Sequence, residues 1–257
     1  MTAIRAGMAR FQPTRWATAM ALPALVVLLG LGAWQLQRLA WKTDLIAYRE
    51  AQLAAPPMAL PTDLGDAGET LAALDYRRVT VTGAFLHDRE IYLAASRRGR
   101  VGFAIITPLR RTGGPGSAGG SAEASATVLV NRGWVPADAR DPARRAEGLV
   151  AGEVTVEGIV RPTARQSWLI PDNDTANNYW FWLDVPAMAE FAGVDAPPLV
   201  VEAGPAPNPG GLPIGKRARV DLPNDHLGYA VTWYALAAAL AVIYYLSQRR
   251  PPRIVRD

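Results

Sequence analysis

His226, just before an apolar stretch near the C-terminus, is the residue best suited to chemistry in this sequence. A helix beginning here, capped by Asn224 or Asp225, would favour the neutral imidazole, which is the form that binds metals. On that helix Tyr229 and Trp233 follow at steps of three and four, so they share a face with His226. His226 could then bind haem iron, with the macrocycle against Tyr229 and Trp233. The alternative is an interfacial histidine beside an ordinary aromatic belt.

The rest of the sequence contains little that suggests catalysis. The other histidine, His87, lies in a turn-like sequence and is expected to face solvent. There is no glycine-rich phosphate loop, paired-histidine motif or nucleophile elbow. Cysteine is absent, which excludes disulfides, thiolate metal sites and covalent c-type haem attachment. We therefore expect a protein that is not an enzyme.

Two uncharged apolar stretches, residues 16–37 and 227–248, are the strongest structural signals. Each is long enough, at ~1.5 Å per residue, to cross the ~30 Å hydrocarbon core of a bilayer as a helix. The first stretch ends in bulky residues and not in a small-x-small cleavage site, so we expect a retained anchor. The sequence thus predicts two transmembrane helices, which makes the lipid bilayer a partner.

Positive charge is concentrated at the two ends of the chain, where the arginines are Arg5, Arg10, Arg15, Arg249, Arg250, Arg253 and Arg256. By the positive-inside rule the tails, 1–15 and 249–257, are expected in the cytoplasm or the mitochondrial matrix. Residues 38–226 then lie outside, in the periplasm or the intermembrane space. This outer segment is slightly acidic overall, which excludes a basic stripe suited to nucleic acid.

Arg38 and Lys42 follow the first apolar stretch directly. We interpret them as anchors whose charged groups reach the lipid headgroups beside Trp34 and Trp41. The alternative is that they pair with haem propionates through charge-assisted hydrogen bonds.

The outer segment is expected to be one mostly antiparallel β domain, a small sheet or open barrel, which makes the fold class an α+β membrane protein. β-rich runs occupy residues 78–83, 90–93, 103–106, 127–130, 153–160 and 179–183. Gly133 is expected to permit a turn or bulge, with Trp134 in the core.

Helices and loops complete this prediction. Residues 41–53 continue the first helix, and Asp184 is expected to cap a short helix that stops at Gly193. The Gly/Ser-rich residues 112–126 are expected to form a mobile hairpin loop, and the Pro/Gly-rich residues 203–215 an unstructured connector.

Six blocks of the sequence, in order, resemble those of the surfeit locus protein 1 family. They are residues 32–42, 76–83, 130–136, 158–162, 178–184 and 224–234. The resemblance implies an assembly factor for haem-copper terminal oxidases, chiefly cytochrome c oxidase, with this same hairpin topology. It also implies that haem a binds at His226 and passes to oxidase subunit I, with haem a synthase as a further candidate partner.

Location follows from the resemblance and the composition together. Basic residues are almost all arginine, which is typical of a GC-rich bacterial genome. We therefore expect a multi-pass protein of a bacterial plasma membrane, the mitochondrial inner membrane being the alternative. Two other functions stay open: a scaffold that holds oxidase intermediates without binding haem, and a membrane-tethered enzyme.

Overall fold

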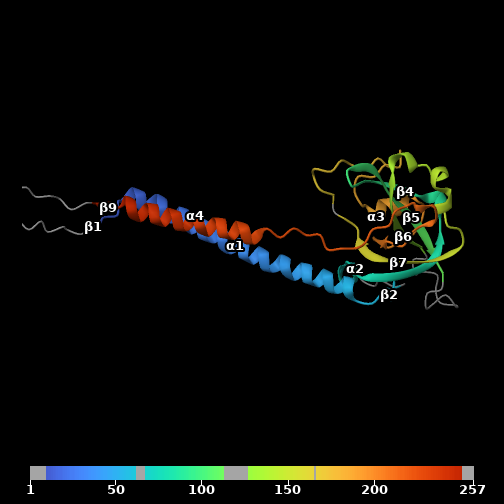
Figure 1. Cartoon of the computed structure of the whole chain (residues 1–257), viewed down its shortest axis with the longest axis horizontal. Helices are drawn as coiled ribbons and strands as arrows, with labels where there is room; N and C mark the ends of the chain where they lie inside the picture. The colour runs from blue at the N-terminus through green and yellow to red at the C-terminus, as the bar shows by residue number, and fades with distance from the viewer. Residues whose placement is uncertain (1–9, 62–66, 113–126, 165, 251–257) are drawn as a thin grey trace, which may run out of the picture. The chain divides into compact units, whose positions relative to one another are not determined.

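The computed structural model describes residues 10–61, 67–112, 127–164 and 166–250 (Figure 1). The chain forms two compact units: residues 1–47 with 221–257, and residues 48–220. We call the described parts of the first unit the helix pair and the second unit the β domain. The tail arginines Arg5, Arg253 and Arg256 lie outside the described residues, as do residues 113–126 of the expected mobile loop.

The helix pair consists of α4 (His226–Ser247) and the part of α1 (Arg15–Ala54) that ends at Ala47. Both helices are long and apolar enough to cross a membrane. They run antiparallel, because Thr18 near the start of α1 contacts Tyr244 near the end of α4, with 2.6 Å between the hydroxyl oxygens. At the same end β1 (Arg10–Phe11) pairs with β9 (Arg249–Arg250). The expected continuation of the first helix through residues 41–53 is confirmed, since α1 extends to Ala54.

The less exposed residues of both helices recur at alternating steps of three and four, the spacing of an antiparallel coiled-coil seam. In α1 this seam comprises Thr18, Ala21, Leu25, Leu28, Gly32 and Gln35, with Ala17 and Leu31 also partly buried beside it, and in α4 it comprises His226, Ala230, Trp233, Ala237, Leu240 and Tyr244. Three of the buried positions are glycine or alanine, which allows close packing of the backbones. The opposite faces expose large apolar side chains, as lipid-facing helices do.

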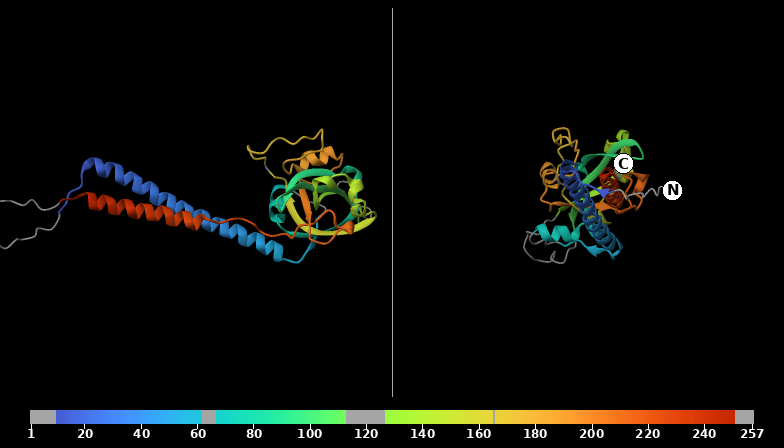
Figure 2. Two further views of the ribbon diagram at one scale, coloured as in Figure 1. Left: turned by 45° about the horizontal axis from the view of Figure 1, so that its top comes forward. Right: turned by 90° about the vertical axis from the view of Figure 1, so that its left-hand side faces the viewer.

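The β domain contains a seven-stranded mixed sheet of order β2-β3-β7-β8-β6-β5-β4. The strands are β2 (Met58–Ala59), β3 (Arg78–Phe85), β4 (Ile91–Arg97), β5 (Arg100–Arg111), β6 (Thr127–Pro136), β7 (Glu153–Pro162) and β8 (Leu199–Ala203). An additional pairing of β3 with β5 closes a barrel, visible in the left view of Figure 2. The open form that we considered is therefore wrong. Among the strands that the structure describes, only β2–β3 and β6–β8 pair in parallel, so the sheet is mostly antiparallel as expected.

The helices of the β domain are short. They are α2 (Ala67–Leu74), α3 (Val185–Phe191) and the 3₁₀ turns η1 (His87–Arg89), η2 (Ala137–Ala139), η3 (Pro142–Gly148) and η4 (Pro209–Gly211). Alternate residues of each strand face opposite sides of the sheet. Val128 and Val130 of β6 accordingly join the cluster inside the barrel, whereas Leu129 packs with Met188 of α3 on the outside. The predicted cap of α3 is confirmed, because the Asp184 carboxylate accepts a hydrogen bond from the Ala187 amide.

Two predictions about secondary structure in the β domain are also wrong. Residues 179–183 form no strand, only isolated bridges at Tyr179 and Trp180. Residues 203–215 are not an unstructured connector, because Ile214 exchanges backbone hydrogen bonds of 2.8 and 2.9 Å with Trp134. The apolar run 199–203 was missed as a strand. It is short and follows Pro197-Pro198, and its place between β6 and β7 depends on contacts distant in sequence.

The prediction at Gly133 is confirmed. Between Ile105 and Ile106 the register of β5 against β6 shifts by one residue, which leaves Arg132 as the extra residue of a bulge. Gly133 has φ 122°, a backbone conformation that side chains rarely adopt. A Cβ there would also meet the Ile214 carbonyl, and the adjacent Trp134 is buried.

Candidate functional site

The candidate site lies in the helix pair, where α4 begins. His226 is the first residue of α4, after the N-cap residue Asp225, whose side chain makes no capping hydrogen bond. Its imidazole Nδ1 lies 2.7 Å from Oε1 of Gln35, a side chain of α1 that is 8% exposed. Further along α1, Thr43 makes a second hydrogen bond to the segment before α4: Nδ2 of Asn224 donates to its Oγ1 at 3.3 Å.

This contact determines how His226 presents its ring. An amide oxygen only accepts hydrogen bonds, so Nδ1 carries the proton and donates it to Gln35. In the neutral ring the lone pair is then on Nε2, the nitrogen available to a metal. Metal-binding histidines commonly have their second nitrogen held by a carbonyl or carboxylate in this way. Gln35 lies in the block 32–42, but nothing in the residues around it predicts this role.

The aromatic residues of α4 differ in their surroundings. Trp233 is half-buried on the face that packs against α1, together with His226. Tyr229 is 58% exposed and lies beside that face. Both rings are therefore within one or two turns of His226, one in the helix contact and one on the outward surface.

The two basic residues of α1 lie one to two turns after Gln35. The Arg38 guanidinium lies 4.7 Å from the centre of the Trp41 ring and 6.0 Å from that of Trp34, while Lys42 is half-buried. An arginine spread over two tryptophans is what a headgroup anchor requires. Among the described residues, no hydrogen bond or ion pair joins either of these side chains to His226.

The donor set suits a group held by one protein ligand. Among the described residues, no three His, Cys, Asp or Glu side chains gather into a group that could hold a metal ion. A haem brings four nitrogen ligands of its own, so a single imidazole with a free nitrogen is sufficient to bind it. His226, with Nδ1 held by Gln35 and Nε2 free, would therefore suit a haem as its one protein ligand.

A second group of polar residues, which the sequence analysis did not identify, is buried in the β domain. Glu90 contacts Arg145, whose NH1 lies 3.2 Å from Oε1, and Arg132, whose NH1 lies 3.5 Å from the same oxygen. All three side chains are at most 2% exposed. Arg132 also donates to the Gly148 carbonyl and stacks on Phe85, with 4.6 Å from the guanidinium carbon to the ring centre.

The expectation that His87 faces solvent is wrong, because it belongs to this buried group. Its Nε2 lies 3.0 Å from the Val150 carbonyl oxygen, and its Nδ1 lies 3.6 Å from Oε1 of Glu90. The polar sequence around His87 resembles an exposed turn, but η1 turns the ring toward residues that are distant in sequence. The contacts of the group tie η1, β6 and η3 together, so we interpret it as structural.

Electrostatics supports this interpretation. Burial by itself would raise the pKa of Glu90, but hydrogen bonds from His87 and Arg145 and the charges of Arg145 and Arg132 outweigh it and lower that pKa. Burial lowers the pKa of Arg132. Glu90 is therefore ionised at neutral pH and neutralises buried positive charge.

Comparison with known proteins places this geometry in a family. The profile described as the SURF1 family matches residues 22–238, a range that includes Gln35 and His226. The chain belongs to the SURF1 family. It is 36% identical over 233 residues to Surfeit locus protein 1 of Homo sapiens, covering 86% of this chain and 73% of the human protein. The mouse (Mus musculus) protein is likewise 36% identical over 231 residues, covering 84% of this chain and 70% of its own length. The SURF1-like protein of Monosiga brevicollis is 37% identical over 237 residues, covering 88% and 85%.

Proposed function

We propose that this SURF1-family protein is a membrane-anchored assembly factor for cytochrome c oxidase, which binds haem a and helps to deliver it to subunit I. Family membership supports the assembly role. The haem role depends on one observation: Gln35 holds Nδ1 of His226 and leaves Nε2 free to bind iron. Haem a, when bound, supplies the iron centre that the oxidase needs. This chain binds and orients it and carries out no catalysis.

Each residue of the site has a part in this proposal. His226 would hold the haem iron, and Gln35 would fix the tautomer and ring orientation of His226. Trp233 and Tyr229 offer aromatic surface to the macrocycle, while Arg38 and Lys42 can pair with its propionates. Any further ligand to the iron would come from water, another copy of the chain or a partner. Haem a synthase would be the donor of the cofactor.

We further propose that α1 and α4 cross the membrane, with both tails on the cytoplasmic side and the β domain outside. The apolar outward faces of both helices and the arginines that flank them support this topology. A bacterial plasma membrane is the proposed location, on the arginine-rich composition; the relatives described above are eukaryotic, so the mitochondrial inner membrane is the alternative.

The test is an absorption spectrum of the full chain purified from cells that make haem a. We expect a haem a spectrum for the parent protein and its loss in His226→Ala and His226→Gln. The glutamine variant keeps a polar side chain opposite Gln35, so it removes the ligand more selectively than alanine does. An unchanged haem spectrum in both variants would exclude His226 as the ligand.

A scaffold without haem is the second candidate, and the same contact favours it. A histidine that hydrogen-bonds a buried glutamine also joins two helices, which needs no cofactor. Recovery of a stable complex with subunit I, free of haem and unaffected by His226→Gln, would support the scaffold. Loss of haem from a complex that still forms would support the carrier.

A further inference from the structure

The β domain displays an apolar turn that its own core does not use. Trp168 is 89% exposed, Leu169 is 71% exposed and Ile170 is 37% exposed. Three consecutive exposed apolar residues are unfavourable in water unless they serve a function. We refer to residues 166–172 as the apolar turn.

The apolar turn is built to hold this shape. The backbone amide of Ile170 donates to the Ser167 carbonyl at 2.9 Å. The side-chain nitrogen Nε2 of Gln166 lies 3.2 Å from the Ile170 carbonyl oxygen and 2.9 Å from Asp172 Oδ1. The segment after it is clamped by Asn173, whose side-chain oxygen accepts from the Phe181 amide at 2.8 Å. The three apolar side chains are therefore displayed by an ordered turn.

The position of the apolar turn within the β domain indicates what it meets. The turn projects from the side of the domain on which the last turns of α1, from residue 48 onward, and the segment 216–220 also lie (Figures 1 and 2). This is the side on which the chain enters and leaves the domain. From Val220 to His226, the first residue of α4, the chain can reach at most about 20 Å even when extended. A membrane crossed by α4 is thus close to the domain.

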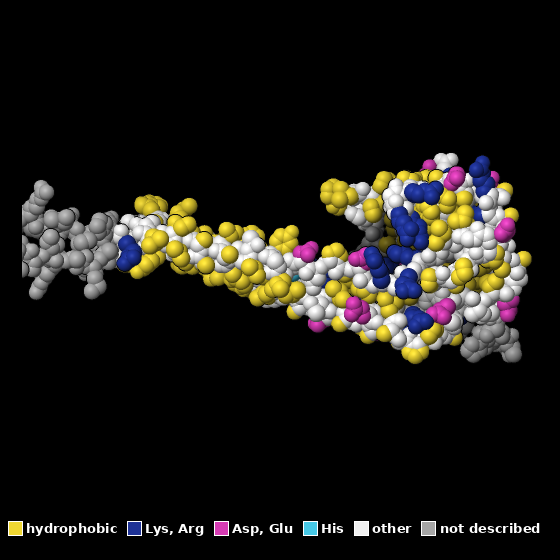
Figure 3. Space-filling view, viewed as in Figure 1, with side chains coloured by type: hydrophobic (Ala, Val, Ile, Leu, Met, Phe, Trp, Pro, Cys, Tyr) yellow, Lys and Arg dark blue, Asp and Glu magenta, His cyan; other side chains and the backbone are white. Residues whose placement is uncertain are grey.

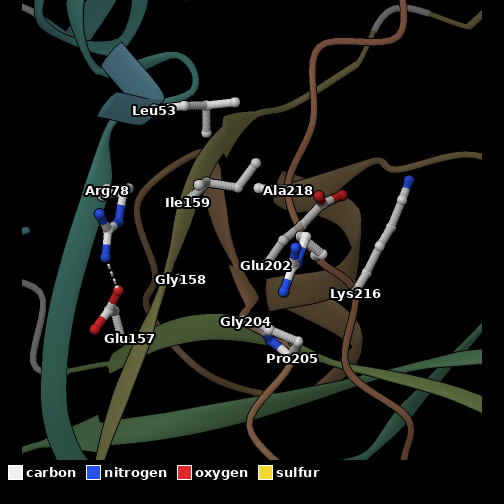
Figure 4. A pocket seen from close by; sticks show the side chains of 11 residues that line it. Leu53, Arg78, Glu157, Gly158, Ile159, Glu202, Gly204, Pro205, Lys216 and Ala218 are labelled. Carbon is white, nitrogen blue, oxygen red and sulfur yellow. Dashed lines mark hydrogen bonds and ion pairs between the residues drawn. The ribbon is translucent and has the colours of Figure 1, made fainter. Parts of the chain in front are cut away.

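Charge on the same side suits a membrane surface. Figure 3 shows Lys and Arg side chains gathered near a projecting group of hydrophobic side chains on the β domain. Lys216 and Arg217 are exposed and line a groove with Arg78, shown in Figure 4, in which Arg78 already pairs with Glu157. Lys216 also lines the neighbouring hollow, together with Arg97. Basic side chains attract anionic headgroups, whereas tryptophan prefers the interface between headgroups and hydrocarbon.

We propose that the apolar turn inserts into the outer-leaflet interface of the membrane, with Lys216 and Arg217 against anionic headgroups. The inference rests on the proposed membrane topology but goes beyond the haem role. Such a third contact, besides the two helices, would hold the β domain at the membrane surface.

Single-cysteine labelling tests the proposal directly, because the chain contains no cysteine. The full chain is reconstituted into vesicles of phosphatidylcholine and phosphatidylglycerol that contain doxyl-labelled lipid, with a bimane probe at Leu169→Cys. A matched probe at Ala151→Cys is exposed and adjoins β7 at the end where Glu153 pairs with Ala84. β2, which follows α1, pairs at the other end of β3, at Val79 and Thr80. A third probe, at Val27→Cys, reports on α1 itself.

We expect severalfold stronger lipid quenching at residue 169 than at residue 151. Equal quenching at both residues would overturn the insertion. So would a Leu169 probe that is shielded only when a copurified protein is present, because the turn would then dock on a protein. The Val27 probe separates the two proposals: quenching at residue 27 without quenching at 169 keeps the transmembrane helix and removes the insertion of the turn. Quenching at residue 169 without quenching at residue 27 would keep the insertion of the turn and remove the transmembrane helix.

Discussion

The imidazole of His226 donates from Nδ1 to Oε1 of Gln35 across 2.7 Å, although 191 residues separate them in sequence. The bond connects the start of α4 to the middle of α1, and it joins the two functions that the helix pair can have. It holds the helices together, and it directs the free nitrogen of a candidate ligand.

The first prediction concerns Gln35 as a positioning residue. Gln35→Ala should weaken haem a binding by about 10- to 100-fold, the usual effect of losing a partner that orients a metal ligand. Gln35→Glu keeps an acceptor for Nδ1 and should restore most of the affinity. Gln37→Ala is the matched control, because Gln37 is exposed on the same helix. Spectroscopic titration with haem a measures all three, and equal affinities for Gln35→Ala and Gln37→Ala would contradict the assignment.

A second prediction concerns the packing of the helix pair. Gly32 is buried, and a Cβ there would lie 2.8 Å from the Cζ of Tyr234, whereas a Cβ at Gly30 would meet nothing within 4 Å. Gly32→Leu should therefore separate the helices and lower the thermal midpoint of the detergent-solubilised protein by several degrees. Gly30→Leu should leave the midpoint nearly unchanged. If both variants behave alike, the helices do not pack through Gly32.

A third prediction concerns the buried ion pairs of the β domain. Glu90→Gln leaves Arg132 and Arg145 buried without a neutralising charge, and should lower the free energy of unfolding by about 3–5 kcal/mol. Glu190→Gln, at an exposed position of α3, should change it by less than about 0.5 kcal/mol. Denaturant unfolding of the two variants, monitored by tryptophan fluorescence, makes the comparison. A cost for Glu90→Gln no larger than that for Glu190→Gln would show that the pairs are not stabilising.

The stability of the β domain should also depend on pH through the carboxylate of Glu90. Burial raises the pKa of Glu90, but hydrogen bonds and charges from His87, Arg145 and Arg132 outweigh it and hold that pKa below the ordinary value of a glutamate, so the unfolded chain takes up the proton first as the pH falls. The contribution of Glu90 is complete above that value and is lost as the pH drops through the folded pKa. The midpoint of denaturant unfolding should hence decline more steeply below about pH 4.5 in the parent protein than in Glu90→Gln. Parallel declines would argue against Glu90.

The last prediction concerns the bulge in β6. Gly133→Ala places a side chain at φ 122° and against the Ile214 carbonyl, so it should cost more than about 2 kcal/mol. Gly152→Ala is the control, because Gly152 has φ 82° but nothing within 4 Å of the added Cβ. The difference between the two unfolding free energies isolates the clash with Ile214. A similar cost for both would mean that backbone strain alone determines the effect.

Local signals in the sequence were sufficient for much of the fold. Alternation of apolar and polar residues in β3 and β7 identifies strands with one wetted face, and Asp184 and Gly193 mark the ends of α3. The aromatic run at 179–183 has the composition of a strand, but Trp180 packs singly into the core beside α3. Within the run, Tyr179 and Trp180 each form one isolated bridge and no ladder. Strand composition there reflects burial and not membership of the sheet.

By itself the sequence determined the two apolar helices, most strands of the β domain and the candidate ligand His226, because each depends on periodicity or composition within one segment. The tertiary structure decided the closure of the barrel through β3 and β5, the contact of His87 with the Val150 carbonyl and the pairing of His226 with Gln35. These three depend on contacts between segments far apart in the chain, and the hydrogen-bonding partner of a side chain cannot be inferred from the residues adjacent to it in sequence.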